Sequence, residues 1–204
     1  MENIQLKPYE TCYYETDVPR GIVNVQPAYA AMIDSSSTRF KLRLPKIPVD
    51  IYNKIVSLFK KYAQLYNVEC LARVFWDIDE ERYCLVVPFQ QVSISSVYPI
   101  QQEHDEWLIT HIPVLEIHSH GVAFDAFWSG IDDADEVHRH LLYGVFSFRR
   151  GINEEEQCLF RCCNGSPEYV IPLRKENLFE DGAFEYEAKF VKSIMDSERI
   201  NIVR

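Results

Sequence analysis

The stretch 114–136, VLEIHSHGVAFDAFWSGIDDADE, decides how the chain is expected to fold. It begins with an apolar run that is typical of a buried β-strand. The irregular aromatic segment that follows, residues 121–128, predicts a loop, and a short acidic helix is expected to begin near Asp132. The stretch therefore predicts a strand, a loop and a helix in direct succession.

The predicted strand ends in two histidines, His118 and His120. Residues i and i+2 of a strand point to the same side of a sheet, so both imidazoles can reach one ion. Asp132, at the start of the predicted helix, can close a third side with a carboxylate. Two nitrogens and one oxygen are ligands that zinc accepts, and they leave a fourth position for water, whose pKa falls to about 7 when it is bound. These residues predict a Zn²⁺ site.

Other nearby side chains are rival ligands. Asp125, Asp133 and Asp135 are carboxylates close in sequence to the preferred aspartate. A second histidine pair, His138 and His140, lies in the predicted helix, where positions i and i+2 do not face each other. We expect that second pair to be solvated.

On either side of this stretch, the spacing of apolar residues is helical in some segments and that of strands in others. Apolar residues recur at helical spacing from Ile51 to Tyr62 and predict a helix over 49–66, which Asn67 can close. A C-terminal helix is expected near 184–197. Helices and strands mix without a regular βα alternation, which favours an α+β fold built in layers. The predicted strands cover residues 30–34, 40–45, 69–76, 82–88, 91–98, 107–120, 141–149, 157–163 and 168–173.

Composition and charge narrow the class of protein. The chain has 204 residues, a net charge of −10 and 47% hydrophobic residues, which suits a globular chain with a substantial core. Nucleic-acid binding usually needs a basic face, so we expect no nucleic-acid partner. Neither a secretory signal nor an apolar run long enough to span a bilayer is evident, so we expect no membrane partner. The six cysteines form no CxxC pair, and a reduced cytoplasmic protein explains them best.

The string EIHSH…AFWSGIDDADE, within residues 116–136, resembles the signature of the JAMM (MPN+, JAB-domain) metalloproteases: an upstream glutamate, then H-x-H, then S-x-x-D. It is most similar to the bacterial, phage and plasmid-borne branch, as are VECLARVFWD at 68–77 and VPFQ at 87–90. The resemblance covers residues 45–165. It implies a cytidine-deaminase-like fold of α/β/α layers with a curved mixed sheet flanked by helices.

The resemblance implies roles for five residues. His118, His120 and Asp132 would be the zinc ligands. Ser129 would hydrogen-bond the developing oxyanion of a tetrahedral intermediate. Glu69 would be the general acid/base, which accepts a proton from water and delivers it to the leaving amine.

Two alternatives stay open. Glu116, at i−2 from His118, would share the face of that histidine, either as the acid/base or as a partner that orients an imidazole. The loop 121–128 is one residue longer than is usual in the family, and Gly121 stands where a proline is usual. Gly121 could absorb the extra residue through its backbone freedom, or the loop could displace Ser129 and weaken catalysis while zinc still binds.

The aromatic side chains of this loop, Phe124, Phe127 and Trp128, have two interpretations. They line a substrate groove, or they anchor the loop in the core. Arg161, in a predicted strand, could contact an acidic substrate tail, but we expect it to be solvated.

The expected function is zinc-dependent hydrolysis of an amide bond by a JAMM-type metallopeptidase. The resemblance implies an isopeptidase or peptidase that acts on the tail of a ubiquitin-like protein or on a peptide, which would enter extended beside the active-site sheet. The alternative is a metal-free MPN module that serves as a scaffold for protein interactions. We expect residues 1–20 to form an irregular arm and residues 21–204 to form a single JAB/MPN-like domain with extensions at both ends.

Overall fold

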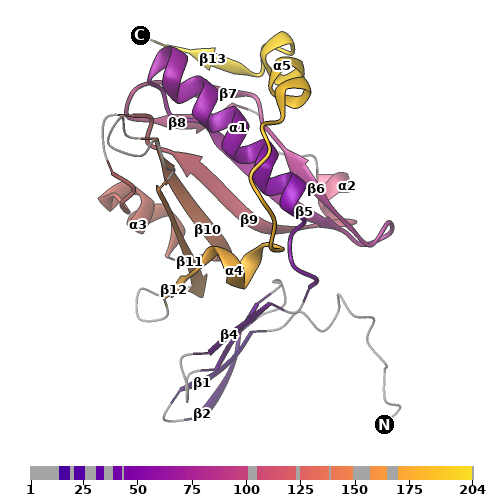
Figure 1. Cartoon of the computed structure of the whole chain (residues 1–204). Coiled ribbons are helices and arrows are strands. Elements are labelled where there is room, and N and C mark those ends of the chain that lie inside the picture. Colours follow the sequence, from indigo (N-terminus) through magenta and orange to yellow (C-terminus); the bar gives the residue numbers. More distant parts are fainter. Residues whose placement is uncertain are drawn as a thin grey trace.

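The computed structural model describes residues 14–18, 21–25, 31–34, 39–42, 44–100, 105–122, 125–137, 139–148, 157–164 and 170–203. Its centre is a six-stranded mixed sheet with the strand order β12-β11-β10-β9-β5-β6 (Figure 1). β9 and β10 run parallel, and the other neighbouring pairs in this sheet are antiparallel. The strands are β5 (Leu71–Asp77), β6 (Arg82–Val86), β9 (His111–Ser119), β10 (His140–Ser147), β11 (Gln157–Asn164) and β12 (Ile171–Leu173).

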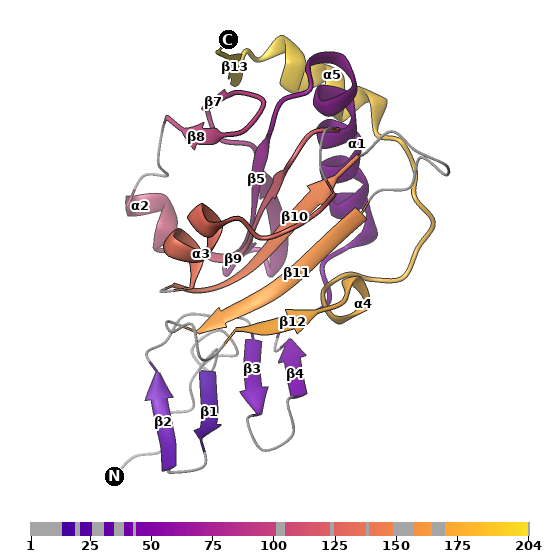
Figure 2. The same ribbon diagram turned by 90° about the vertical axis from the view of Figure 1, so that its left-hand side faces the viewer.

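Helices cover both faces of this sheet. α1 (Val49–Tyr66) crosses one face with α5 (Ala188–Asp196) beside it, and Figure 2 shows α3 (Gly130–Glu136) on the opposite side. α2 (Asp105–Leu108) also lies on the α3 side, and the short α4 (Lys175–Leu178) follows β12. The arrangement confirms the predicted α+β fold, with a mixed sheet between layers of helices.

Three smaller sheets accompany the central one. One has three strands in the order β13-β7-β8, and the other two are antiparallel pairs, β1-β2 and β3-β4. These two pairs lie at one end of the molecule, beyond β12 (Figures 1 and 2). The strands are β1 (Tyr14–Val18), β2 (Gly21–Val25), β3 (Ala31–Asp34), β4 (Arg39–Leu42), β7 (Gln90–Val92), β8 (Val97–Pro99) and β13 (Ile200–Ile202).

The expectation of an irregular arm over residues 1–20 is wrong in part. Residues 14–18 form β1, which pairs in antiparallel register with β2 from Tyr14↔Val25 to Val18↔Gly21. A hairpin satisfies the backbone groups that an isolated irregular segment would leave to water. Residues 1–13 and 19–20 lie outside the described residues.

Two predicted strands are also interrupted. The strand expected over 91–98 is the two short strands β7 and β8, joined by a turn in which Ser93 N–H donates to Ser96 O at 2.8 Å. The segment 107–120 was expected to be one strand, but its first two residues belong to α2 and the strand β9 starts only at His111. In α2, Trp107 packs edge-on against an aromatic ring of β5, with centroids 4.6 Å apart.

The predicted helix over 49–66 is confirmed as α1. Asn67 ends it in the left-handed conformation, with φ 52°, and its N–H donates to Ala63 O at 3.0 Å. The apolar spacing gives α1 one buried face, which packs on the sheet. None of the described helices is both long and apolar enough to cross a membrane.

Two apolar clusters lie on the two faces of the sheet. The larger fills the space between α1 and the sheet, and the smaller lies on the α3 side around Leu141, Tyr143 and Cys163. Cys162 belongs to the larger cluster, so the adjacent cysteines point to opposite faces, as expected for a strand. None of the five cysteines that the structure describes forms a disulfide bond with another of them.

Candidate metal centre

Strand β9 delivers two histidines to the edge of the sheet where it ends. His118 is in register with Leu71 of β5 and Val145 of β10. His120 follows the strand, and its N–H donates to Phe146 O at 2.8 Å. Because β10 runs parallel to β9, the connecting helix α3 begins at the carboxyl end of β9, where ligands of mixed sheets commonly bind.

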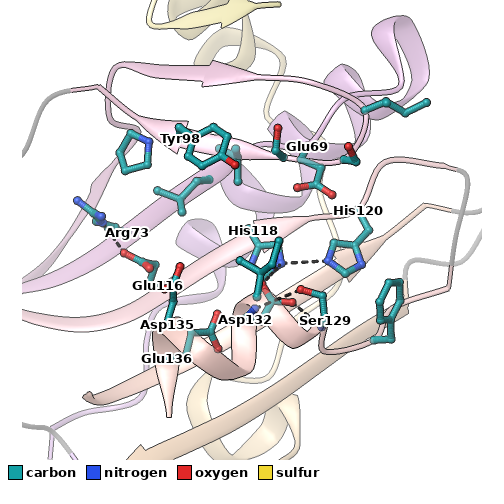
Figure 3. Close-up of a pocket in the computed structure, with 18 of the residues that line it drawn as sticks. Glu69, Arg73, Tyr98, Glu116, His118, His120, Ser129, Asp132, Asp135 and Glu136 are labelled. Carbon is teal, nitrogen blue, oxygen red and sulfur yellow. Dashed lines mark hydrogen bonds and ion pairs between the residues drawn. The ribbon is translucent and has the colours of Figure 1, made fainter. Parts of the chain in front are cut away.

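The ligand atoms of the three predicted residues converge here. The Nε2 atoms of His118 and His120 are 3.1 Å apart, and His118 Nε2 lies 3.4 Å from Asp132 Oδ1 (Figure 3). One ligand atom from each of the three residues lies within 4.8 Å of the others. Both histidines are buried, with 7% and 6% of their surface exposed. The three side chains therefore form a group that can hold a metal ion.

The spacing and protonation of this group suit a cation. Ligands at about 2.0–2.1 Å from a tetrahedral zinc would be about 3.3 Å from one another, close to the observed 3.1 and 3.4 Å. Burial lowers the pKa of His118 to about 4, although the charge of Asp132 opposes this shift, and burial also lowers the pKa of His120. Both imidazoles are thus neutral near pH 7, which is the form that binds metals.

A capping box fixes the third member of the group. Ser129 is the N-cap of α3: its Oγ accepts Asp132 N–H at 3.2 Å, and its own N–H donates to Asp132 Oδ2 at 2.6 Å. This exchange leaves Asp132 Oδ1 directed at His118. The S-x-x-D spacing is therefore the spacing of a helix cap, and the helix start sets the position of the carboxylate. The Ser129 Oγ accepts in this box, so its hydroxyl hydrogen can be donated into the cleft.

The longer loop leaves the serine and the aspartate in contact. Gly121 has φ +66°, a left-handed conformation that a proline at this position could not adopt. The next N–H, of Val122, donates to Asn67 Oδ1 at 3.0 Å, which ties the loop to the end of α1. The structure keeps Ser129 and Asp132 in contact, with Gly121 in the left-handed conformation, and the effect of the longer loop on catalysis stays a prediction.

Glu69 faces the histidines across the cleft (Figure 3). It immediately precedes Cys70, whose N–H donates to Ser119 Oγ at 3.0 Å and whose O accepts Ser119 N–H at 2.9 Å. These bonds hold the start of β5 against the end of β9. Burial and then the charge of Asp132 raise the pKa of Glu69 to about 8. A carboxyl group that keeps its proton near neutrality is suited to proton transfer.

Glu116 is engaged elsewhere. Its Oε2 accepts from Arg73 Nε at 2.6 Å, and the two side chains, 15% and 16% exposed, form a partly buried ion pair between β9 and β5. Figure 3 shows this pair beyond His118, on the side away from His120. Of the two candidate glutamates, Glu69 is therefore the one that faces both imidazoles.

The rival ligands stay apart from the histidines. Asp125, Asp133 and Asp135 are exposed, and within the described part of the chain the group around the histidines takes none of them. α3 ends at Glu136, and His140 is the first residue of β10 rather than part of a helix as expected. His138 and the side chain of His140 lie outside the described residues.

His120 lacks one feature of a well-supported ligand. Its Nδ1 is buried and meets no hydrogen-bond partner within the segments that the structure describes. Ligating histidines usually donate this second N–H to a carbonyl or a carboxylate. The ring instead packs edge-on against Phe127, with centroids 4.7 Å apart, and this contact helps to orient it.

The expectation that Arg161 is solvated is wrong, because only 4% of the residue is exposed. Its Nε and Nη2 donate to Glu136 Oε2 at 3.0 and 2.7 Å, and its Nη1 donates to Asp133 Oδ1 at 2.5 Å. The guanidinium also lies 3.9 Å from the centre of the Trp128 ring. Arg161 stands on β11, so it holds α3, and with it Asp132, against the sheet.

Comparisons with known proteins leave the family open. No protein-family model matches the sequence, and no curated protein matches it. Among solved structures, the solution structure of protein DSY2949 from Desulfitobacterium hafniense is similar at 15% sequence identity and a TM-score of 0.39, covering 71% of this chain and 96% of that one. The proposal for function therefore rests on the geometry of the site.

Gln90, like Arg161, has a structural role that the sequence did not predict. It is fully buried, its Oε1 accepts Leu71 N–H at 2.8 Å, and its Nε2 donates to Leu71 O at 2.9 Å and to Pro88 O at 3.2 Å. The amide thereby takes the place of a neighbouring strand at the start of β5. It joins the β13-β7-β8 sheet to the central one next to Glu69.

The loop aromatics divide between the two expected roles. Trp128 packs on the small cluster around Tyr143 and anchors the loop. Phe127 is 46% exposed and lines the cleft beside His120. Phe124 lies outside the described residues.

A cleft of about 330 Å³ opens over the candidate metal centre. The segment 94–99, which includes β8, forms one wall, and α3 with Phe127 forms the other. The rim carries exposed apolar side chains on both sides, with Ile94 55%, Tyr98 63% and Ile131 69% exposed. The cleft thus combines a polar, titratable floor with apolar walls, which is the usual character of a binding site.

Proposed function

We propose that this chain is a zinc-dependent hydrolase of amide bonds, a metallopeptidase or isopeptidase of the JAMM type. The observation that supports this most is the meeting of two neutral imidazole nitrogens and one carboxylate oxygen, 3.1 and 3.4 Å apart, below a carboxyl group with a raised pKa. Zinc accepts this donor set, and three protein ligands leave one position open.

His118, His120 and Asp132 would hold the ion. When bound, zinc supplies a Lewis acid that polarises a carbonyl and lowers the pKa of water to about 7. The capping box holds the aspartate in place, and burial keeps the histidines unprotonated. The chain itself therefore contributes a preorganised set of ligands, with α3 as their support.

Glu69 would hold and move the proton. Its carboxylate faces the two imidazoles, and its pKa of about 8 lies near neutral pH. A group with such a pKa can both accept a proton and release it to a leaving amine. Burial is the main cause of this raised pKa, and the negative charge of Asp132 adds to it.

Ser129 would donate to the oxygen that develops negative charge. It lines the cleft, and its backbone is fixed as the N-cap of α3. A donor whose position is fixed before reaction stabilises such a charge more than a mobile one. The serine therefore couples two functions, capping the helix and binding the oxyanion.

The substrate would be an extended peptide segment, such as the tail of a ubiquitin-like protein. β8 is the edge strand of its sheet and lines the cleft, so a peptide can pair with it through backbone hydrogen bonds. The exposed apolar side chains of both walls would then contact alternate residues of that peptide.

Hydrolysis of peptide amides and lysine-linked isopeptides by the zinc-loaded protein tests this proposal. Glu69→Gln should lower kcat/KM by about 10²–10⁴-fold without loss of zinc. Glu116→Gln is the matched control, because it makes the same change at a carboxylate that lines the same cleft but pairs with Arg73. Its kcat/KM should change by less than about 10-fold. Equal losses in both variants, or no cleavage of any such substrate by the native protein, would overturn the proposal.

A further inference from the structure

A second group of metal-ligating side chains lies at the other end of β5. Asp77 is the last residue of β5, His111 is the first residue of β9, and Cys84 is in the middle of β6. Asp77 lies six positions along β5 from Leu71, which is in register with His118, and six positions span about 20 Å in an extended strand. The group is therefore independent of the candidate centre described above.

The strand register places the three side chains on one face. Asp77 is paired with His111 across β5 and β9, and Cys84 is paired with Phe75 across β5 and β6. Phe75 and Asp77 are at positions i and i+2, so Cys84 lies on the face of Asp77. One ligand atom of each of the three residues lies within 4.8 Å of the others. Three neighbouring strands thus supply one ligand each.

The histidine is already oriented for binding. Its ring stacks on Trp107 with centroids 3.8 Å apart, and its Nδ1 lies 3.1 Å from Trp107 O. A carbonyl oxygen can only accept, so Nδ1 carries the hydrogen, which the Thr110 hydroxyl oxygen at 2.9 Å can share. Nε2 is then the nitrogen with a lone pair, and it faces Asp77 Oδ2 at 3.6 Å. Support of the second nitrogen by a carbonyl is typical of ligating histidines.

The aspartate is oriented in the same way. Its Oδ1 accepts the N–H groups of Asp79 and Glu80, at 3.0 and 3.1 Å, in the turn that joins β5 to β6. This leaves Oδ2 directed at His111. A lone pair of Nε2 and an oxygen of a carboxylate thus face each other, and a cation between them would satisfy both.

We propose that Asp77, Cys84 and His111 form a second, thiolate-containing metal site that takes a thiophilic divalent cation, with Zn²⁺ as the first choice. Thiolate, imidazole and carboxylate are all zinc ligands, and three of them leave a position for water. The cysteine and the histidine are only half-buried, so an ion can enter from the surface. Bound there, the ion joins three strands at the end of the β5-β6 hairpin.

Titration of the metal-free protein with Co²⁺ tests this site separately from the first one. Bonding of a thiolate to Co²⁺ gives an intense near-ultraviolet charge-transfer band, and the donor set of the first centre has no sulfur. We expect this band in the native protein, with two equivalents of Co²⁺ bound. It should persist in the His118→Ala variant, with one equivalent bound, so that failure of the first centre does not affect this test.

Cys84→Ser and His111→Gln are the decisive variants, each checked for native circular dichroism. Cys84→Ser should abolish the near-ultraviolet band and reduce binding from two equivalents to one. His111→Gln, which keeps the thiol, should weaken Co²⁺ binding at this site at least 10-fold. Absence of the band in the native protein, or a band unchanged in Cys84→Ser, would overturn the proposal.

Discussion

Asp132 caps a helix and also belongs to the candidate metal centre. Its Oδ2 accepts Ser129 N–H, which completes the capping box of α3, and its Oδ1 faces His118 at 3.4 Å. The geometry of the cap therefore determines where the candidate ligand oxygen points. The S-x-x-D motif of the sequence has the spacing of three residues that a capping box requires. The sequence therefore showed the motif, and the structure shows that the helix cap is its physical reason.

Glu69 makes a testable contribution to the pH dependence of stability. In the metal-free protein its folded pKa of about 8 exceeds the ordinary value of 4.5. The folded state then binds the extra proton between these values, so the stability contributed by this group falls as pH rises through that window. Urea unfolding of Glu69→Gln should show a gain in stability over the native protein that grows from pH about 4.5 to about 8 and then levels off. A gain that is constant over this range would contradict the buried, protonated state.

Arg161 should support the metal centre without touching it. Arg161→Met leaves the carboxylate of Glu136 buried without a partner, so we expect a loss of about 3–5 kcal/mol in the free energy of unfolding. Zinc affinity should fall about 10–100-fold, because the helix that carries the ligand is less firmly held. Arg161→Lys keeps the charge and serves if the first variant does not fold.

The control for this change is Arg82→Met, at an exposed arginine of β6. It should alter the free energy of unfolding by less than about 0.5 kcal/mol and leave the zinc affinity of the centre formed by His118, His120 and Asp132 unchanged, as measured by competition with a chromophoric chelator. Equal effects of the two substitutions would rule out a positioning role for Arg161.

At the scale of elements, the site is the meeting point of three chain segments. The residues just before β5 include Glu69, the carboxyl end of β9 brings the two histidines, and the start of α3 brings Ser129 and Asp132. Each element was predictable from local periodicity. Between β9 and α3 the chain leaves the strand through Gly121, whose φ of +66° is left-handed.

Gly121 and Gly130 provide a matched pair for this loop. A Cβ on Gly121 would lie 2.9 Å from Asn67 Oδ1, at a φ of +66°, whereas a Cβ on Gly130 would meet nothing within 4 Å. Gly121→Ala should therefore destabilise the protein by about 1–2 kcal/mol. Gly130→Ala, in the first turn of α3, should be neutral or stabilising by up to about 1 kcal/mol. Urea unfolding would measure both, and equal destabilisation would contradict the described loop.

At the scale of the whole molecule, the parts that the sequence did not predict depend on distant partners. Arg161 contacts a residue 25 positions away, and Gln90 contacts one 19 positions away. Local periodicity does not predict such pairs. The contacts of Arg161 with α3 and the hydrogen bonds of Gln90 between the two sheets could therefore be identified only in the structure. The three candidate ligands, by contrast, lie within 15 residues of sequence and follow from strand and helix spacing.

The separation of β7 and β8 into their own sheet has the same cause. Periodicity at 91–98 is that of a strand, but it cannot say which sheet the strand joins. The pairing of β7 with the C-terminal β13 decides this, because it draws the segment away from the central sheet. That displacement creates one wall of the cleft.

Zinc content of the purified protein, measured by plasma mass spectrometry, tests the central claim most directly. His118→Ala and Asp132→Ala should each bind one zinc fewer per chain than the native protein. Asp135→Ala, which removes a carboxylate from the same helix and cleft, should bind as much as the native protein. If the native protein binds no zinc after reconstitution under reducing conditions, or if both ligand variants retain the full amount, the metal centre and the hydrolase built on it are contradicted.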